Sequence, residues 1–304
     1  MTYAKYTYIY KTTQDCQIQA DVYRLPGEAQ QPAILWLHGG GLIFGDRTRI
    51  RPEQVEQYLA AGYTVVSIDY RLAPETKLQA ILEDLKDGYD WVRRQGPALF
   101  QIDPDRLAVI GHSAGGYLTL MAGFWVDPRP KALISFYGYG DIAGEWYSRP
   151  SPHYCKEPAV SPEVAYQGVG GTAITEGQSD QRWLFYLYCR QQGLWPKEVT
   201  GYDPHTEPQA FERFCPIRNI TPDYPPTLLL HGDEDTDVPF EQSSQMAASL
   251  KQHQIPHQLI TMKGFGHGFD VFPDRNGAPI GLKHPQVAEA FEKVLVFLKE
   301  HVSN

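Results

Sequence analysis

Short apolar runs separated by helical patterns are the feature that most restricts how this chain can fold. Because these runs are continuous rather than alternating, they indicate strands that are buried on both faces of a mostly parallel sheet. We therefore predict an α/β fold in which helices flank a parallel sheet. The apolar runs cover residues 33–37, 64–68, 107–110, 132–136, 227–230 and 258–262, and helical patterns cover about 78–95, 114–124, 241–253 and 285–299.

Two shorter signals refine this pattern. The first 24 residues alternate between polar and apolar positions and carry tyrosines at every second or third position, which predicts antiparallel edge strands. Gly96 and Pro97 follow the helical pattern of residues 78–95 and predict that this helix ends there.

The strand–helix alternation stops between Gly138 and Pro225, where proline, glycine, tyrosine and tryptophan become frequent. A structureless loop of that length is improbable in a compact domain, and Trp183 to Gln192 has a helical pattern. We therefore predict one domain over residues 1–304 with a cap inserted at about 139–225, above the sheet edge where ligands bind. We expect most aromatic residues of the cap to form its core and the rest to line a pocket. These residues are Trp146, Tyr147, Tyr154, Tyr166, Trp183, Phe185, Tyr186, Tyr188 and Trp195.

Charge and cysteine content exclude several classes of partner. Acidic residues outnumber basic ones by 36 to 27, and the formal charge of −9 disfavours nucleic acid and anionic membrane surfaces. No stretch approaches the roughly 18 apolar residues of a membrane-spanning helix, and the first 11 residues lack a signal-peptide core. Cys16, Cys155, Cys189 and Cys215 show no metal-binding spacing. We expect free thiols, a cytoplasmic location and no metal or cofactor, although a disulfide among the last three cysteines is left open. The sequence permits a homo-oligomer but does not indicate one.

The five residues Gly111-His112-Ser113-Ala114-Gly115 lie between an apolar run and a helical pattern. They match G-x-S-x-G, the pattern of the sharp strand-to-helix turn that exposes the nucleophile of α/β-hydrolases. Small neighbours are required because the backbone bends tightly around the serine. Ser113 is therefore the predicted nucleophile.

A second glycine-rich turn, His38-Gly39-Gly40-Gly41, directly follows the first apolar run. Such a turn can simply end a strand, but glycines also allow backbone N–H groups to face the oxygen of a tetrahedral intermediate. With the serine motif downstream, we predict an oxyanion hole formed by the N–H groups of Gly40, Gly41 and Ala114.

The general base is expected among ten histidines. His267 lies in a glycine-rich loop beyond the last apolar run, which matches the Ser–Asp–His order of this fold. His112 precedes the nucleophile, and its side chain should diverge from that of Ser113. For the acid, the loop at 233–239 leaves three residues open, and they are Asp233, Asp235 and Asp237.

These motifs together resemble the hormone-sensitive-lipase-like branch of the α/β-hydrolases, which includes small bacterial esterases. The matching segments are HGGG at 38–41, DYRLAPE at 69–75, GHSAGG at 111–116, HGDEDTDVP at 231–239 and GFGHGF at 264–269. The resemblance implies that the acid is Asp235, because the acid loop of such enzymes commonly has the spacing HGxxDxxVP. Two departures, His112 before the nucleophile and a cap before the fifth run, resemble the esterases that border the prolyl oligopeptidase family.

The expected function is hydrolysis of small acyl or aryl esters through an acyl-enzyme on Ser113. A serine peptidase or amidase would use the same three side chains. A non-catalytic binder is the third alternative, because the plant gibberellin receptor resembles this branch but lacks a working triad. The intact set of Ser113, Asp235 and His267 argues against the binder.

Overall fold

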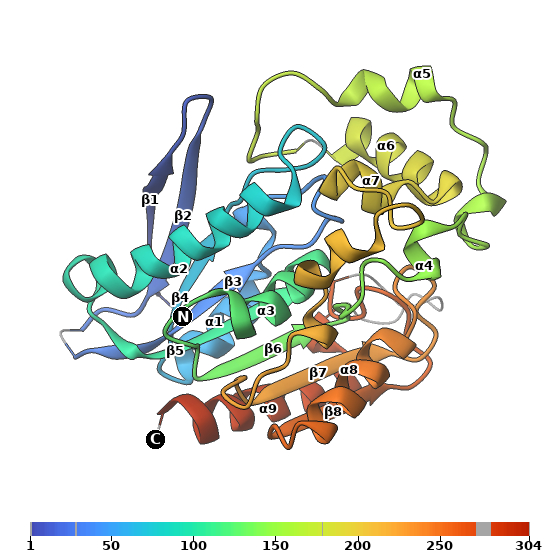
Figure 1. Cartoon of the computed structure of the whole chain (residues 1–304). Helices are drawn as coiled ribbons and strands as arrows, with labels where there is room; N and C mark the ends of the chain where they lie inside the picture. Colours follow the sequence, from blue (N-terminus) through green and yellow to red (C-terminus); the bar gives the residue numbers. More distant parts are fainter. Residues whose placement is uncertain (1, 28, 178, 272–280, 304) are drawn as a thin grey trace.

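The computed structural model describes residues 2–27, 29–177, 179–271 and 281–303. Its centre is one eight-stranded sheet in the order β1-β2-β4-β3-β5-β6-β7-β8 (Figure 1). All neighbouring strands from β4 to β8 in this order are parallel, whereas β1 pairs with β2 and β2 with β4 in antiparallel fashion. The predictions of a mostly parallel sheet and of antiparallel strands in the first 24 residues are thus confirmed. The strands are β1 (Ala4–Thr12), β2 (Gln17–Arg24), β3 (Gln31–Leu37), β4 (Thr64–Ile68), β5 (Ile102–His112), β6 (Ala132–Phe136), β7 (Thr227–Gly232) and β8 (His257–Met262).

The continuous apolar runs arise because successive residues of a strand pack against opposite helical layers. In β3, Leu35 and Leu37 join the core on the side of α2, α3 and α8, whereas Ile34 and Trp36 join the core on the side of α1 and α9. Both faces of the sheet are therefore buried. The covering helices are α1 (Pro52–Ala60), α2 (Leu78–Phe100), α3 (Ala114–Trp125), α8 (Glu241–Gln252) and α9 (Pro285–Leu298).

Two helices differ from the sequence-based expectation. Helix α1 was not predicted, although Pro52 at its start and the spacing of Val55, Tyr58 and Leu59 are typical of a helix with one buried face. Helix α2 does not end at Gly96-Pro97 but continues to Phe100, so that part of the prediction was wrong.

Packing of the last turn of α2 explains its extension past Pro97. Phe100 is fully buried, and its ring lies 5.5 Å from that of Trp91 and 6.0 Å from that of Tyr8. Burial of one large aromatic side chain contributes about 2–3 kcal/mol, which is comparable to the cost of about 3 kcal/mol for proline in a helix. Gln101 then ends the helix in the left-handed conformation, with φ of 54°.

Between β6 and β7 the chain forms helices and turns and, among its described residues, no strand (Figure 1). We call residues 139–225 the cap segment. Its helical elements are α4 (Glu145–Ser148), η2 (Tyr154–Lys156), α5 (Pro162–Ala165), η3 (Tyr166–Gly168), α6 (Ser179–Gln192), α7 (Trp195–Thr200), η4 (Pro208–Phe214) and η5 (Pro216–Arg218). In the described residues outside the cap segment, the short helical turns are η1 (Arg47–Arg49), η6 (Gly281–Lys283) and η7 (Lys299–Ser303).

The aromatic residues of the cap segment divide into two groups. Tyr147 and Trp195 are fully buried and stack with ring centroids 3.9 Å apart, so they form part of its core. Tyr154, Trp183 and Tyr186 instead line the large pocket described below. All four cysteines of the chain are free thiols. Among the described residues, no helix is both long and apolar enough to cross a membrane.

Candidate active site

Ser113 occupies a sharp turn between β5 and α3. Its backbone has φ of 57° and ψ of −118°, a conformation that costs a non-glycine residue about 1–3 kcal/mol. The turn is held by the Ser113 N–H, which donates to the Phe136 carbonyl at 2.9 Å. It also requires close backbone contacts, because a Cβ at Gly115 would lie 2.1 Å from the Leu37 carbonyl oxygen. The surrounding strands thus hold Ser113 in a conformation that the isolated peptide would avoid.

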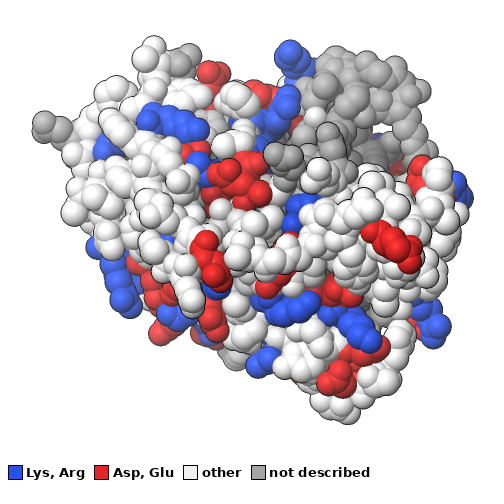
Figure 2. Space-filling view, turned by 90° about the horizontal axis from the view of Figure 1, so that it is seen from above, with Lys and Arg blue, Asp and Glu red and all other residues white. Residues whose placement is uncertain are grey.

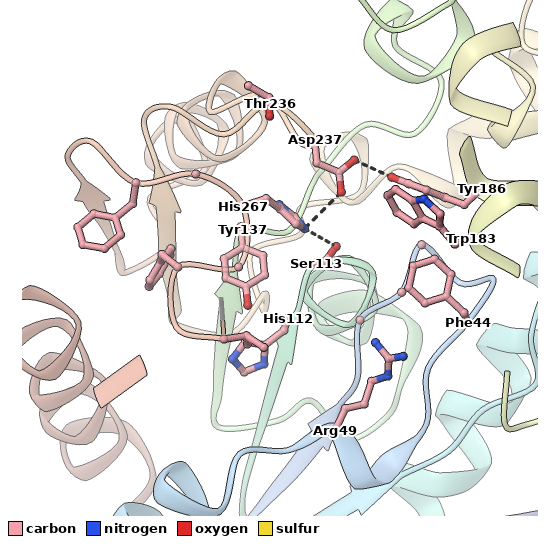
Figure 3. Close-up of a pocket in the computed structure, with 18 of the residues that line it drawn as sticks. Phe44, Arg49, His112, Ser113, Tyr137, Trp183, Tyr186, Thr236, Asp237 and His267 are labelled. Atoms are coloured by element: carbon pink, nitrogen blue, oxygen red, sulfur yellow. Dashed lines mark hydrogen bonds and ion pairs between the residues drawn. The ribbon is translucent and has the colours of Figure 1, made fainter. Parts of the chain in front are cut away.

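His267 lies in the loop after β8 and faces Ser113 (Figure 3). Its Nε2 is 2.9 Å from Ser113 Oγ, and its Nδ1 is 2.7 Å from Asp235 Oδ2. An ionised carboxylate only accepts hydrogen bonds, so Nδ1 carries a proton and Nε2 is the nitrogen that accepts from the serine hydroxyl. The three side chains form one continuous hydrogen-bonded chain.

The loop after β7 places the three candidate acids in different surroundings. Asp235 has a fully buried side chain, and its Oδ1 accepts from the N–H groups of Asp237 and Val238, both at 2.9 Å. Asp233 is exposed and accepts from the Gly264 N–H at 2.6 Å. Of the three, Asp235 is the one that reaches His267 Nδ1, which is the position the resemblance implied.

Asp237 takes a place that the sequence did not predict. Its Oδ2 lies 3.5 Å from His267 Nε2, on the side of the imidazole that faces Ser113. Its Oδ1 accepts from the Tyr186 hydroxyl at 2.7 Å and from the Arg190 guanidinium, both on α6 of the cap segment. Figure 3 shows the contacts of Asp237 with His267 and Tyr186. No local motif indicates this link, because it joins residues 47 positions apart.

Burial and nearby charges shift the pKa values of Asp235 and His267 in opposite directions. Burial alone would raise the pKa of the Asp235 carboxyl, but the imidazole of His267 and hydrogen bonds from both His267 and His231 hold it well below its usual range. Burial alone would lower the pKa of His267, but the carboxylates of Asp235 and Asp237 outweigh that effect and raise it above 6.5. The site therefore favours an imidazolium next to an ionised carboxylate, the charge pair that forms when a serine loses its proton.

The glycine-rich turn after β3 lies beside Ser113, and Gly39, Gly40 and Gly41 line the same pocket. The turn is closed by the N–H groups of Ile43 and Phe44, which donate to the Gly40 carbonyl at 2.9 and 3.0 Å. Gly40 has φ of +115°, and a Cβ there would lie 1.9 Å from the Phe44 carbonyl oxygen.

Ala114 and His38 complete this part of the site. Ala114 is the first residue of α3, where backbone N–H groups have no partner within the helix. His38 is buried and stacked on Tyr70, with ring centroids 4.1 Å apart. Burial lowers the pKa of His38 to about 4, so this histidine stays neutral and anchors the turn.

His112 turns away from Ser113, as expected, and packs on Phe136 with ring centroids 4.4 Å apart. Its Nε2 lies 2.9 Å from Asp270 Oδ2 in a buried polar cluster. Asp270 also accepts from the Tyr137 hydroxyl and from Gln54 Nε2, both at 2.6 Å. Burial alone would raise the pKa of Asp270, but His112 and these donors lower it. Tyr137 connects this cluster to the site, because its ring centroid is 4.7 Å from that of His267.

Ser113 and His267 open into a pocket of about 640 Å³. Its walls come from the turns after β3 and β5, the loops after β7 and β8, and the cap segment. Aromatic side chains make up much of the lining, and they are Trp36, Phe44, Tyr137, Tyr154, Trp183, Tyr186, Phe265 and Phe269. In the described part of the chain, no three His, Cys, Asp or Glu side chains are grouped so that they could hold a metal ion.

A mostly parallel sheet with a serine at a strand–helix turn, hydrogen-bonded to a histidine from a later loop, defines an α/β-hydrolase. Comparison with protein families agrees with this class. The BD-FAE family matches residues 20–250, and the dienelactone hydrolase family matches residues 216–302. The BD-FAE match covers more than half of this chain, so the chain belongs to the BD-FAE family.

Solved structures share the fold over nearly the whole chain. A Staphylococcus aureus protein of unknown function is 24% identical with a TM-score of 0.75, and the match covers 98% of this chain and 99% of that one. An α/β-hydrolase superfamily protein from Enterococcus faecalis is 23% identical with a TM-score of 0.70, covering 98% and 100%. Esterase 2 of Thermogutta terrifontis is 21% identical with a TM-score of 0.66, covering 96% and 94%.

Curated relatives include much longer proteins. The non-reducing polyketide synthase Preu3 of Preussia isomera is 27% identical over 90% of this chain. The non-reducing polyketide synthase adrD of Penicillium roqueforti is 28% identical over 97% of it. The chain spans only 13% and 14% of the length of these two proteins.

Proposed function

We propose that this chain is a serine esterase that cleaves carboxylic esters through an acyl-enzyme on Ser113. The observation that carries the proposal is the continuous chain from Asp235 Oδ2 through His267 to Ser113 Oγ, with distances of 2.7 and 2.9 Å. Membership of the BD-FAE family and a fold shared with a protein described as an esterase support it. The motifs that resemble the hormone-sensitive-lipase-like branch support the assignment of the chain to that branch.

In the proposed reaction, Ser113 Oγ attacks the ester carbonyl while His267 Nε2 takes the hydroxyl proton. Asp235 stabilises the imidazolium, and the N–H groups of Gly40, Gly41 and Ala114 bind the oxyanion of the tetrahedral intermediate. Collapse of this intermediate breaks the bond to the alcohol, which leaves with the proton from His267. Water then attacks the acyl-enzyme, with His267 again as base, and releases the acid and free Ser113.

Aromatic side chains in the pocket favour a small acyl or aryl ester as the substrate, because flat apolar groups pack well between rings. Tyr154, Trp183 and Tyr186 of the cap segment line the same pocket as Ser113, which supports the proposed role of this segment as a substrate-covering insertion in a single domain. A cytoplasmic location, the absence of metals and cofactors, and the exclusion of nucleic acid and membrane surfaces stay predictions from the sequence.

The test compares wild type with Ser113→Ala on p-nitrophenyl esters of increasing acyl length, beside an aryl amide. We expect ester turnover that falls by about 10⁴-fold or more in Ser113→Ala, because the nucleophile is lost. Ser244→Ala on α8 is the matched control and should keep wild-type turnover.

An organophosphonate, located by mass spectrometry, should label Ser113 of the wild type. Faster cleavage of the amide than of every ester would instead assign a peptidase or amidase. Substantial turnover by Ser113→Ala would contradict the serine mechanism.

A further inference from the structure

The charged groups that line the pocket are unequally compensated. Asp237 is paired with the buried Arg190, and Arg51 is paired with Glu53 at 3.1 Å. Arg49 also lines the pocket and, among the described residues, has no ion-pair partner within 4.0 Å. Burial raises the pKa of Asp46 on the same turn, but hydrogen bonds from Thr48 and the charge of Arg49 lower it, so Asp46 offsets part of the Arg49 charge from beyond ion-pair distance. Arg49 is thus a pocket cation without a direct ion pair, although the whole chain carries a formal charge of −9.

Arg49 is exposed at the end of η1, and Figure 3 shows its guanidinium pointing into the pocket below Phe44. The guanidinium carbon lies 5.6 Å from the centre of the Phe44 ring, within the range of a cation–π contact. This contact leaves the N–H groups at the edge of the guanidinium available for a ligand.

The backbone that carries Arg49 is firmly held. Asp46 begins η1 and accepts from the Thr48 N–H at 2.8 Å, so its carboxylate serves as the cap of this turn. The neighbouring Arg47 is buried, and its guanidinium binds Asp69 and lies 3.2 Å from Asp21. An arginine on a fixed turn loses less entropy on binding than one on a mobile loop.

We propose that the ester substrate carries a carboxylate group and that Arg49 binds it. The planar guanidinium matches a carboxylate in a two-pronged hydrogen-bonding geometry. Acidic and basic side chains are interspersed on the face shown in Figure 2, so a local cation at the pocket supplies the attraction for an anionic substrate. This inference rests on the proposed esterase function, because it names the substrate class of the same site.

The test uses two pairs of esters that differ in one negative charge. In the first pair, 4-acetoxybenzoate and its methyl ester, the carboxylate is on the leaving phenol. In the second pair, p-nitrophenyl hemiglutarate and p-nitrophenyl valerate, it is on the acyl group. The quantity measured is the ratio of kcat/KM for the anionic ester to that for its neutral partner, which cancels general damage to the enzyme.

In at least one pair, we expect Arg49→Gln to lower this ratio by about fivefold to tenfold, the size of a partly exposed ion pair. Arg94→Gln is the matched control, because it removes the same charge from a side chain that is 80% exposed on α2, and it should leave the ratio unchanged. The effect of Arg49 should shrink as KCl rises from about 20 mM to about 500 mM, because salt screens exposed charges. Ratios that are equal in wild type and Arg49→Gln for both pairs would overturn the inference.

A binding measurement distinguishes a failure of the carboxylate site from a failure of the proposed esterase function. Trp36 and Trp183 line the pocket, so quenching of tryptophan fluorescence reports its occupancy without turnover. Both anionic esters and their neutral partners are titrated onto Ser113→Ala, with and without Arg49→Gln. We expect Arg49→Gln to weaken binding of the anionic member selectively in at least one pair. Equal effects on the two members of both pairs would refute the carboxylate site, whereas an absence of ester turnover in wild type would refute the esterase alone.

Discussion

The ion pair between Asp237 and Arg190 should set the pH at which His267 becomes active. In the proposed mechanism His267 must be neutral, so activity is lost as the pH falls through its pKa. The groups that face the imidazole are Asp235 and Asp237 from the loop after β7, Ser113 from the turn after β5, and the ring of Tyr137, with the charge of Arg190 behind Asp237. Removing Asp237 or Arg190 changes one charge of this set.

The two changes should have opposite signs. Asp237→Asn removes a negative charge that stabilises the imidazolium, so the pKa of His267 falls. The acid limb, which is the part of the pH–activity profile where activity is lost on acidification, then moves to lower pH. Arg190→Gln leaves the carboxylate of Asp237 without its buried partner, so the pKa of His267 rises and the acid limb moves to higher pH.

The distance of 3.5 Å between Asp237 Oδ2 and His267 Nε2 gives the magnitude. At an effective dielectric constant of about 20, an uncompensated carboxylate at that distance stabilises the imidazolium by about 5 kcal/mol. Arg190 binds the same carboxylate and offsets most of this in the wild type. Each variant removes one of the two opposing charges and leaves the other uncompensated, so each should move the pKa of His267 by about one unit or more.

The assay is the pH dependence of kcat/KM for phenyl acetate, which has no titrating group, at constant ionic strength. Asp105→Asn and Arg94→Gln change the net charge by the same amounts at side chains that are 79% and 80% exposed, and they should leave the limb in place. Circular dichroism and thermal melting check folding, because the partners are buried. If Asp237→Asn and Arg190→Gln moved the limb in the same direction, or did not move it, the electrostatic reasoning would be refuted.

Three other measurements test the site. Asp235→Asn should lower kcat by about four orders of magnitude because His267 loses its orienting carboxylate, while Asp233→Asn should cost far less; the reverse order would require a different acid. Tyr137→Phe should lower the free energy of unfolding by about 1–3 kcal/mol, because Asp270 is buried and loses a donor at 2.6 Å; urea melts measure this, and an unchanged midpoint would contradict it. Prolonged chelation should leave ester turnover unchanged, and loss of activity that zinc or calcium restores would reveal a metal site.

The sequence by itself determined the features that depend on local pattern. Continuous apolar runs such as residues 33–37 predict strands with both faces buried, and the sheet confirms this. The glycines around Ser113 predict a tight turn, because a larger side chain there would collide with the backbone. His267 could be singled out among the histidines because its glycine-rich loop follows the last strand.

Only the tertiary structure decided features that depend on long-range contacts. Asp233, Asp235 and Asp237 are equivalent in local pattern, and only the fold determines that Asp235 meets Nδ1 of His267 while Asp237 binds the cap segment. The contact of Asp270 with Gln54 joins residues 216 positions apart. Local propensity also failed at Pro97, where burial of Phe100 offsets most of the cost of proline in a helix. In each case the deciding free energy comes from side chains that are distant in the sequence, which no local pattern can encode.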